Sequence, residues 1–214
     1  MAQQLIISVS REYGSGGHDV ALALSRYFEL PFYDKNLLDV IAEERGIDGE
    51  RLKAFDESPI NHLLYRTVRG HNNSPEAGIA HLQFDFLREK AESGESFVVV
   101  GRCSEDILKD YPGFISIFVL GDRETKIKRV MERENMSYEE AAERAEKCDR
   151  NRKTYHNTFT DTKWGDSRNY DLSVNSSKLG IEKTIQLLET YIDARVQHQW
   201  LTVKREAEKE NTGD

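Results

Sequence analysis

The residues best suited to chemistry are the glycines that follow an apolar stretch at Leu5–Ser10. Gly14, Gly16 and Gly17 let backbone N–H groups approach an oxyanion, and a helix beginning here adds the positive end of its dipole. Phosphate is the natural ligand of such a loop. The phosphate-loop pattern G-x-x-x-x-G-K-[ST] is incomplete, because Gly17 and His18 follow Gly16 where lysine and then Ser or Thr are required. A glycine-rich turn without a nucleotide role is the alternative interpretation.

A second group of candidates ends the strongest predicted buried strand of the chain, Phe97–Arg102. Gly101 and Arg102 stand at the C-terminal end of this predicted strand. Ligands of an open parallel sheet bind beyond the carboxyl ends of its strands, so Arg102 is expected to be functional. Asp34 ends a short extended segment and is expected either to contact an acceptor molecule or to cap the following helix.

Arginines alternate with carboxylates in the segment that includes Arg144, Asp149, Arg150 and Arg152. Such alternation is typical of a solvated helix with i,i+4 ion pairs. Arginine is also suited to holding phosphate, because its planar fork binds two oxygens and stays charged. Both interpretations are open from the residue types alone.

The overall composition limits the classes of partner. The 30 Lys and Arg residues are outnumbered by 38 Asp and Glu residues, and the net charge of −8 disfavours nucleic acid and anionic membranes as partners. We find no apolar stretch of membrane-spanning length and no basic leader at residues 1–4, which predicts a cytoplasmic protein. Cys103 and Cys148 lack metal-ligand spacing and are expected to be free thiols.

Apolar segments of strand length alternate with helical patterns along the chain. This alternation predicts an α/β fold with a five-stranded parallel sheet and helices on both faces. The pattern weakens between Gly46 and Ala77, where we expect an insertion with a short helix near Gly49–Phe55 and an amphipathic piece near Ile60–Val68. Ser137 and Glu140 have the spacing of a capping box that starts a charged helix. The charged end of the chain is expected to fray.

Four segments together resemble the cytidylate kinase-like family, which is related to P-loop nucleoside monophosphate kinases. They are Ser10–Gly17, Val98–Cys103, Asp149–Arg152 and the run Trp164–Asp166 followed by Tyr170–Leu172. The resemblance covers nearly the whole chain in order and implies a single P-loop kinase-like domain. Its implied parts are a core at about 1–35, 96–135 and 170–200, an acceptor-binding insertion at about 36–95, a helical lid at about 136–169 and a frayed tail at 203–214.

The resemblance also implies roles for individual residues. The implied donor-binding residues are Tyr13, Gly14, Ser15, Gly16, Gly17, His18 and Asp19. The implied acceptor-binding residues are Asp34, Gln83, Arg102, Asp149 and Arg152. Gly17 falls at the lysine position, Asp19 at the Ser or Thr position, and Cys103 replaces an aspartate of the family pattern. An arginine that the family has upstream of Gln83 is not found at its expected distance, and Arg66 or Arg69 is the substitute we expect.

Phosphoryl transfer depends on alignment and on neutralisation of charge, so the missing lysine requires another cation. Arg11 and Arg150 are the nearest candidates, and with Arg102 and Arg152 they form the expected catalytic set. Asp19 is expected either to hold Mg²⁺, directly or through water, or to act as an ordinary acidic residue in the first turn of a helix.

These observations predict a phosphotransferase that moves the γ-phosphate of ATP to a nucleoside monophosphate, CMP or dCMP first, with Mg²⁺. The expected partners are small nucleotides, without nucleic acid or membrane, and the expected assembly is a monomer or homodimer. Three alternatives are open. They are a kinase of another small acceptor, a catalytically weakened nucleotide-binding regulator and an interaction protein that uses its long final helix.

Overall fold

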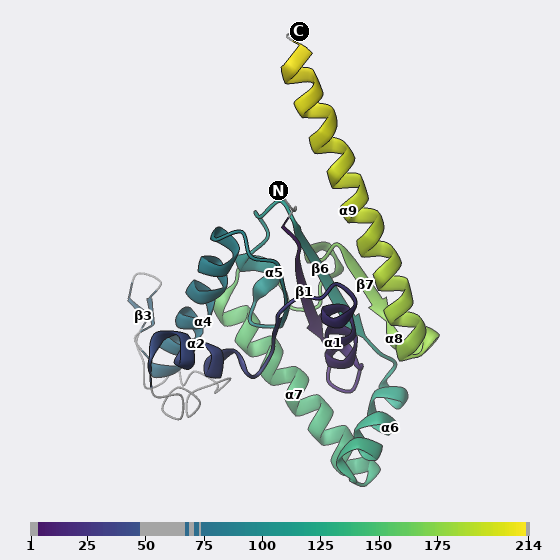
Figure 1. Ribbon diagram of the computed structural model, residues 1–214. Helices are drawn as coiled ribbons and strands as arrows, with labels where there is room; N and C mark the ends of the chain where they lie inside the picture. The colour runs from purple at the N-terminus through teal and green to yellow at the C-terminus, as the bar shows by residue number, and fades with distance from the viewer. Residues whose placement is uncertain (1–3, 48–66, 69–70, 73, 213–214) are drawn as a thin grey trace.

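The computed structural model describes residues 4–47, 67–68, 71–72 and 74–212 of the 214-residue chain (Figure 1). Its centre is a five-stranded sheet in the order β2-β5-β1-β6-β7, in which every neighbouring pair is parallel. The strands are β1 Ile6–Arg11, β2 Phe32–Tyr33, β5 Phe97–Val100, β6 Phe114–Leu120 and β7 Leu172–Asn175, with a separate antiparallel pair β3 Thr67–Val68 and β4 His71–Asn72.

Helices connect these strands. They are α1 Gly17–Tyr27, α2 Leu37–Arg45, α4 Pro75–Glu92, α5 Ser104–Ile107, α6 Arg123–Glu134, α7 Tyr138–Phe159, the 3₁₀ turn η1 Ser167–Asn169, α8 Ser176–Leu179 and α9 Ile181–Thr212. The predicted fold class is confirmed, and so is the capping box, because the Ser137 hydroxyl accepts from the Glu140 N–H while Glu140 accepts from the Ser137 N–H.

Alternate residues of the central strands supply two apolar layers, one on each face of the sheet. Ile7 faces a cluster that includes Leu24 of α1 and Leu188 of α9, all fully buried. Its neighbour Ile6 faces the other cluster, which includes Leu38 of α2 and residues of α4 and α5. Burial on both faces explains why these strands are continuously apolar rather than alternating.

The strand pairing places the functional edge of the sheet. Val9 of β1 lies opposite Val100 of β5, so the chain segments that follow both strands leave the sheet at the same edge. Arg11 ends β1 there, and Arg102 comes two residues after β5 ends. This edge is where ligands of open α/β sheets bind.

One part of the chain differs from the expectation, and another is not described. Helix α9 continues to Thr212 and projects away from the sheet (Figure 1), whereas residues 203–214 were expected to fray. The expected short helix near Gly49–Phe55, most of the amphipathic piece, and Arg66 and Arg69 lie outside the described residues.

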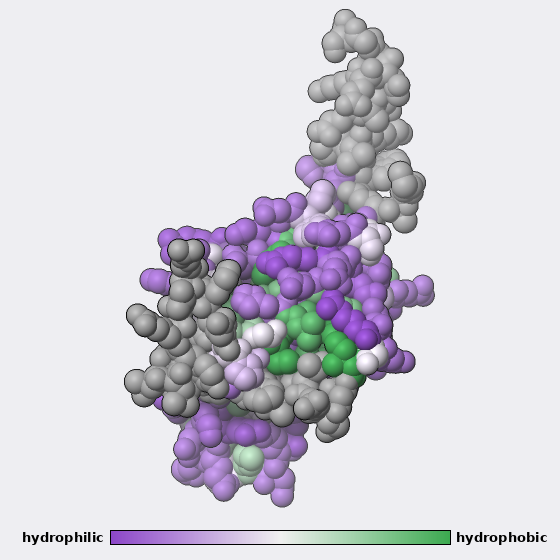
Figure 2. Space-filling view, turned by 90° about the vertical axis from the view of Figure 1, so that its left-hand side faces the viewer, coloured by the Kyte–Doolittle hydropathy of each residue, from purple (hydrophilic) through white to green (hydrophobic). Residues whose placement is uncertain are grey.

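Most of the surface in Figure 2 is hydrophilic, with one hydrophobic area beside the residues drawn in grey. Hydrophilic character is expected for a chain with 32% charged residues. Across the described part of the chain, no helix combines the length and the apolar character that crossing a membrane requires.

The packing can be tested at Gly113, which lies close to the backbone that precedes β1. A Cβ atom at Gly113 would lie 1.8 Å from the backbone oxygen of Gln4, and the Gly113 carbonyl also accepts from the Ile6 N–H. Gly113→Ala should therefore lower the free energy of unfolding by about 2 kcal/mol, measured by urea denaturation. Gly78→Ala is the matched control, because the exposed Gly78 of α4 has open space around it, and this change should stabilise the protein by about 0.5–1 kcal/mol. Equal effects at the two glycines would contradict the packing.

Candidate active site

The loop between β1 and α1 has the backbone conformation of an anion-binding turn. Gly14 and Gly16 take left-handed φ angles of 76° and 78°, which glycine adopts without steric cost. Gly16 is also the N-cap of α1, and the N–H of the next residue, Gly17, donates to Ser15 Oγ at 3.3 Å. The loop therefore presents a helix N-terminus toward the carboxyl edge of the sheet, as the sequence predicts.

Side chains from α6 and α7 hold this loop from outside. The Tyr13 N–H donates to Asp149 Oδ1 at 2.6 Å, and Lys126 Nζ bridges Glu12 Oε2 at 3.0 Å and Asp149 Oδ2 at 3.2 Å. Burial raises the pKa of Asp149, whereas the Tyr13 N–H and Lys126 act in the opposite direction. Asp149 thus joins helix α7 to the loop backbone.

Arg129 of α6 supports the next part of the loop. Its Nη1 donates to the carbonyl oxygens of Ser15 at 3.1 Å and Gly14 at 3.5 Å, and to Ser176 Oγ at 2.9 Å. Two carbonyl oxygens thus point toward Arg129, on the outer side of the loop. On the N–H side, Tyr13 donates to Asp149 Oδ1, Ser15 to the Glu12 carbonyl oxygen and Gly17 to Ser15 Oγ.

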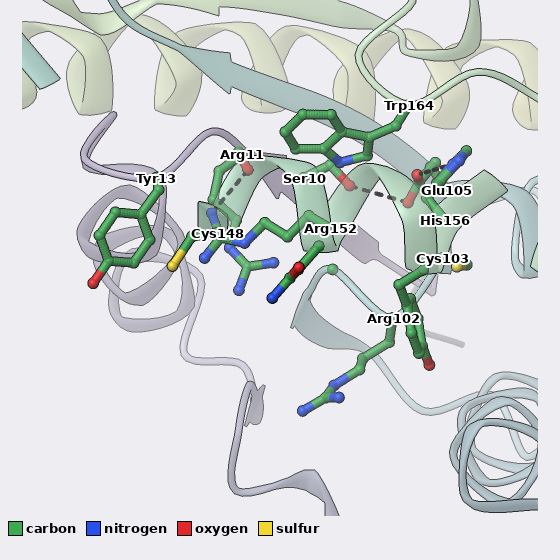
Figure 3. Close-up of a pocket in the computed structure, with 13 residues that line it drawn as sticks. Ser10, Arg11, Tyr13, Arg102, Cys103, Glu105, Cys148, Arg152, His156 and Trp164 are labelled. Atoms are coloured by element: carbon green, nitrogen blue, oxygen red, sulfur yellow. Dashed lines mark hydrogen bonds and ion pairs between the residues drawn. The ribbon is translucent and has the colours of Figure 1, made fainter. Parts of the chain in front are cut away.

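A cavity of about 190 Å³ begins where the loop meets the sheet (Figure 3). It is lined by Ser10, Arg11, Tyr13, Gly101, Arg102, Cys103, Glu105, Cys148, Asn151, Arg152, Tyr155, His156 and Trp164. The lining residues come from the end of β1 and the loop after it, from the turn after β5, from α5 and α7, and from the loop that follows α7. Three of them are arginines, so the cavity suits an anion although the protein is acidic.

Each arginine reaches the cavity from a different element. Arg11 ends β1, Arg102 follows β5, and Arg152 lies on α7. Arg152 Nη1 donates to the backbone oxygen of Arg11 at 3.1 Å, and its guanidinium lies 5.4 Å from the centre of the Tyr13 ring. In Figure 3 the side chains of Arg11 and Arg152 lie side by side, and Arg102 extends from another side of the cavity.

The turn after β5 is strained. Gly101, Arg102 and Cys103 take consecutive left-handed φ angles of 75°, 60° and 53°, which is unusual for the two that are not glycine. The Gly101 oxygen accepts from both the N–H and the Oγ of Ser104, at 3.1 and 2.7 Å. Strain of this kind is concentrated at functional sites, where surrounding contacts maintain it. The buried Arg102 is therefore held in a fixed backbone position.

A buried polar network forms one wall of the cavity. His156 Nε2 lies 2.8 Å from Glu105 Oε1, and both side chains are almost completely buried. Glu105 also accepts from the hydroxyls of Ser10 at 3.1 Å and Tyr170 at 3.2 Å. Burial alone would lower the pKa of His156, but its hydrogen bond with Glu105 and the charge of that carboxylate raise it above the ordinary value. The network joins α7 to α5 through the His156–Glu105 pair.

The predicted site residues do not all meet in this cavity. Arg11, Tyr13, Arg102 and Arg152 line it, whereas Arg150 is exposed on α7 and is absent from the lining. The first four are thus placed together, as the predicted roles require.

The remaining predicted residues lie elsewhere. His18 Nε2 lies 2.8 Å from Asp34 Oδ2, and the centres of the His18 and Phe32 rings are 5.6 Å apart. These contacts connect the start of α1 to the end of β2. The Asp19 side chain is 72% exposed in the first turn of α1. Gln83 is fully buried in α4, and like Asp149 it is not among the residues that line the cavity.

Several residues of the site were missed in the sequence. Lys126 and Arg129 are three positions apart on the helix that follows β6, so their common face and their place after a strand end were available signals. Glu105 and His156 gave no such signal, because their pairing joins segments 51 residues apart.

The sequence model of the cytidylate kinase-like family matches residues 6–178. The chain belongs to this family. Family membership and the P-loop kinase fold support a kinase. A search of curated proteins finds no match.

Solved structures extend this comparison. An uncharacterized protein from Eubacterium ventriosum ATCC 27560 is 40% identical, with a TM-score of 0.71 over 89% of this chain and 99% of that one. Shikimate kinase from Bacteroides thetaiotaomicron is 16% identical, with a TM-score of 0.53 over 88% of this chain and 98% of that one. A gluconokinase from Sinorhizobium meliloti 1021 is 14% identical, with a TM-score of 0.53 over 94% of this chain and 99% of that one. The last two show the same fold.

The buried pair predicts a pH-dependent stability. A histidine whose pKa is raised by folding contributes stability that is fully present below its unfolded pKa of about 6.5 and is lost as the pH rises through its folded pKa. His156→Gln should therefore lower the free energy of unfolding by about 3 kcal/mol at pH 6 and by less at pH 9, measured by urea denaturation. The control is His81→Gln, because His81 lies on the outside of α4. A His156→Gln effect that is equal at both pH values would contradict the assignment.

Proposed function

We propose that the protein transfers the γ-phosphate of ATP to a small anionic acceptor, with a nucleoside monophosphate, CMP or dCMP, as the first candidate. The convergence of Arg11, Arg102 and Arg152 on one cavity carries this proposal. The cavity adjoins the glycine loop, which suits the triphosphate of a donor. Donor and acceptor phosphates would thus meet at the carboxyl ends of β1 and β5.

The arginines would act by alignment and by neutralising charge. Phosphoryl transfer passes through a loose transition state with charge on the equatorial oxygens, so fixed guanidinium groups stabilise it without proton transfer. Arg102 and Arg152 would bind the acceptor's phosphate from two sides. Trp164, which packs edge-on against Phe118 at 5.4 Å, closes one side of the cavity and would help to exclude water.

The carboxylates near the loop fit a Mg²⁺ ion that is held mainly by phosphates and water. Within the described ranges no cluster of three or more His, Cys, Asp or Glu side chains forms a metal cage. Mg²⁺ in kinases is bound by one or two carboxylates plus substrate phosphates. Asp19 would supply such an oxygen in the first turn of α1, and the ion would neutralise phosphate charge. Asp34 would lie next to this ion. Burial acts to raise the pKa of Asp34, but the hydrogen bonds with the Asn36 N–H and with His18 lower it below its ordinary value.

Cys103 favours a second candidate, a kinase of another small anion. The family pattern has an aspartate at this position, and here burial raises the pKa of the Cys103 thiol well above its ordinary value. A neutral thiol cannot accept a hydrogen bond from an acceptor as a carboxylate does. Recognition of the acceptor beyond its anionic group therefore differs from the family pattern. The regulator alternative gains no support from the cavity, because its arginines are in place.

A coupled ATPase assay with CMP, dCMP, UMP, AMP, GMP and small hydroxy carboxylates tests the proposal. We expect turnover with one acceptor, and Arg102→Ala and Arg152→Ala should each lower kcat/KM for it about 100-fold or more, because each removes a fixed cation from the transition state. Arg152→Lys should restore only part of the loss. Lys153→Ala is the matched control, since Lys153 is exposed on the same helix, and it should leave kcat/KM unchanged. ATP binding without turnover on any acceptor would favour the regulator.

The metal assignment has its own test. Removal of divalent ions with EDTA should abolish transfer, and Asp19→Asn should raise the Mg²⁺ concentration for half-maximal rate several-fold while leaving KM for the acceptor unchanged. Asp39→Asn in the first turn of α2 serves as the control for loss of one carboxylate. An unchanged Mg²⁺ requirement in Asp19→Asn would assign Asp19 to the helix dipole alone.

A further inference from the structure

The loop contains a reciprocal exchange of glycine and cation. In the pattern G-x-x-x-x-G-K the first glycine stands six residues before the lysine. With Gly16 as the second glycine, the lysine position is 17 and the first glycine position is 11. Here Arg11 stands at the first and Gly17 at the second, so the positions of the small and the cationic residue are exchanged.

The structure gives a steric reason for the glycine at position 17. Gly17 begins α1 and is not among the glycines with a left-handed φ, so its backbone does not require glycine. A Cβ atom at Gly17 would lie 2.4 Å from Arg11 Cβ and 3.1 Å from Arg11 Cγ. The side chain of Arg11 therefore occupies the space through which a lysine at position 17 would have to leave the helix.

The same side chain runs on toward the acceptor cavity. Arg11 Nη1 lies over Gly101, where a Cβ atom would be only 2.4 Å from it. Arg11 thus passes from beneath the first turn of α1 to the end of β5, and it lines the cavity together with Arg102 and Arg152. Its guanidinium stands between the donor loop and the acceptor cavity (Figure 3).

The other cations near the loop, which are Lys126, Arg129 and Arg150, do not line the cavity. Lys126 Nζ is engaged by the carboxylates of Glu12 and Asp149, and Arg129 donates to loop carbonyls on the outer side. Arg150, the other candidate from the sequence, is exposed and does not line the cavity.

We infer that Arg11 is the catalytic cation of this kinase, in place of the phosphate-loop lysine, and that Gly17 is required because Arg11 fills its side-chain space. The inference rests on the proposed function. The guanidinium of Arg11 binds oxygens of the transferred phosphoryl group and the oxygen that leaves with the donor. No covalent bond to Arg11 is made or broken. The cation enters from the start of the loop instead of its end.

A swap experiment tests this inference. Arg11→Gly should lower kcat about 100-fold or more, and Gly17→Lys should do the same because the lysine stem meets Arg11. Arg11→Gly combined with Gly17→Lys restores the standard spacing and removes the clash with Arg11, while Val119 Cβ lies 3.2 Å from the Cβ position of residue 17. The double variant should recover at least tenfold over Arg11→Gly. Guanidinium chloride at millimolar concentration should partly rescue Arg11→Gly and leave the wild type unchanged.

Three measurements keep the outcomes distinct. Circular dichroism melting establishes that each variant folds, and Arg11→Met, which keeps the stem, replaces Arg11→Gly if that variant does not. If the wild type is active and Arg11→Gly or Arg11→Met keeps full activity, the inference is overturned and the kinase proposal stands. The same holds if activity is lost in Arg150→Ala instead. A wild type without transfer to any acceptor overturns the proposed function. Calorimetric ATP titration then decides the role of Arg11. ATP binding to the wild type that becomes at least tenfold weaker in Arg11→Met supports the inference. Equal affinity in the two proteins, or no binding to the wild type, overturns it.

Discussion

The parallel pairing of β1 with β5 is the constraint on which the site depends. Val9 lies opposite Val100, so the loop after β1 and the turn after β5 leave the sheet side by side. Side chains in a strand alternate between faces, and a shift of one residue would turn every one of them to the opposite layer. The two buried apolar layers oppose such a shift, since Ile6 and Ile7 are both fully buried on opposite faces. Core packing thus determines where Arg11 and Arg102 stand.

An acidic protein creates a local cationic cavity here by giving nearby carboxylates other partners. Asp149 Oδ1 lies 2.6 Å from the Tyr13 nitrogen but 3.9 Å from Arg152 Nη1. Glu105 is bound by His156, Ser10 and Tyr170 within the wall. The net charge of −8 is that of the whole chain and does not give the charge of this site. Local arrangement, rather than total charge, decides which ligands a cavity attracts.

Much of the fold could be predicted, because its signals are local. Apolar runs of strand length alternate with helical periods, and the apolar run Phe114–Leu120 is strand β6 with the same bounds. The predicted strand Phe97–Arg102 ends two residues earlier, at Val100. The loop glycines and Arg102 could be placed in the site because they follow strand ends. Glu105, His156 and the supporting Lys126 could not be found this way, since their roles arise from contacts between distant segments.

The order of residues is enough to show that a glycine loop follows the first strand, that this loop lacks a lysine and that several arginines are available. Which arginine enters the cavity depends on how the chain folds. Arg150 and Arg152 are two residues apart on one helix, and a helix turns about 100° per residue, so they point to nearly opposite sides. The contact between Arg11 and Gly17 likewise depends on how the loop closes, because only the folded turn brings Arg11 Cβ against the first turn of α1.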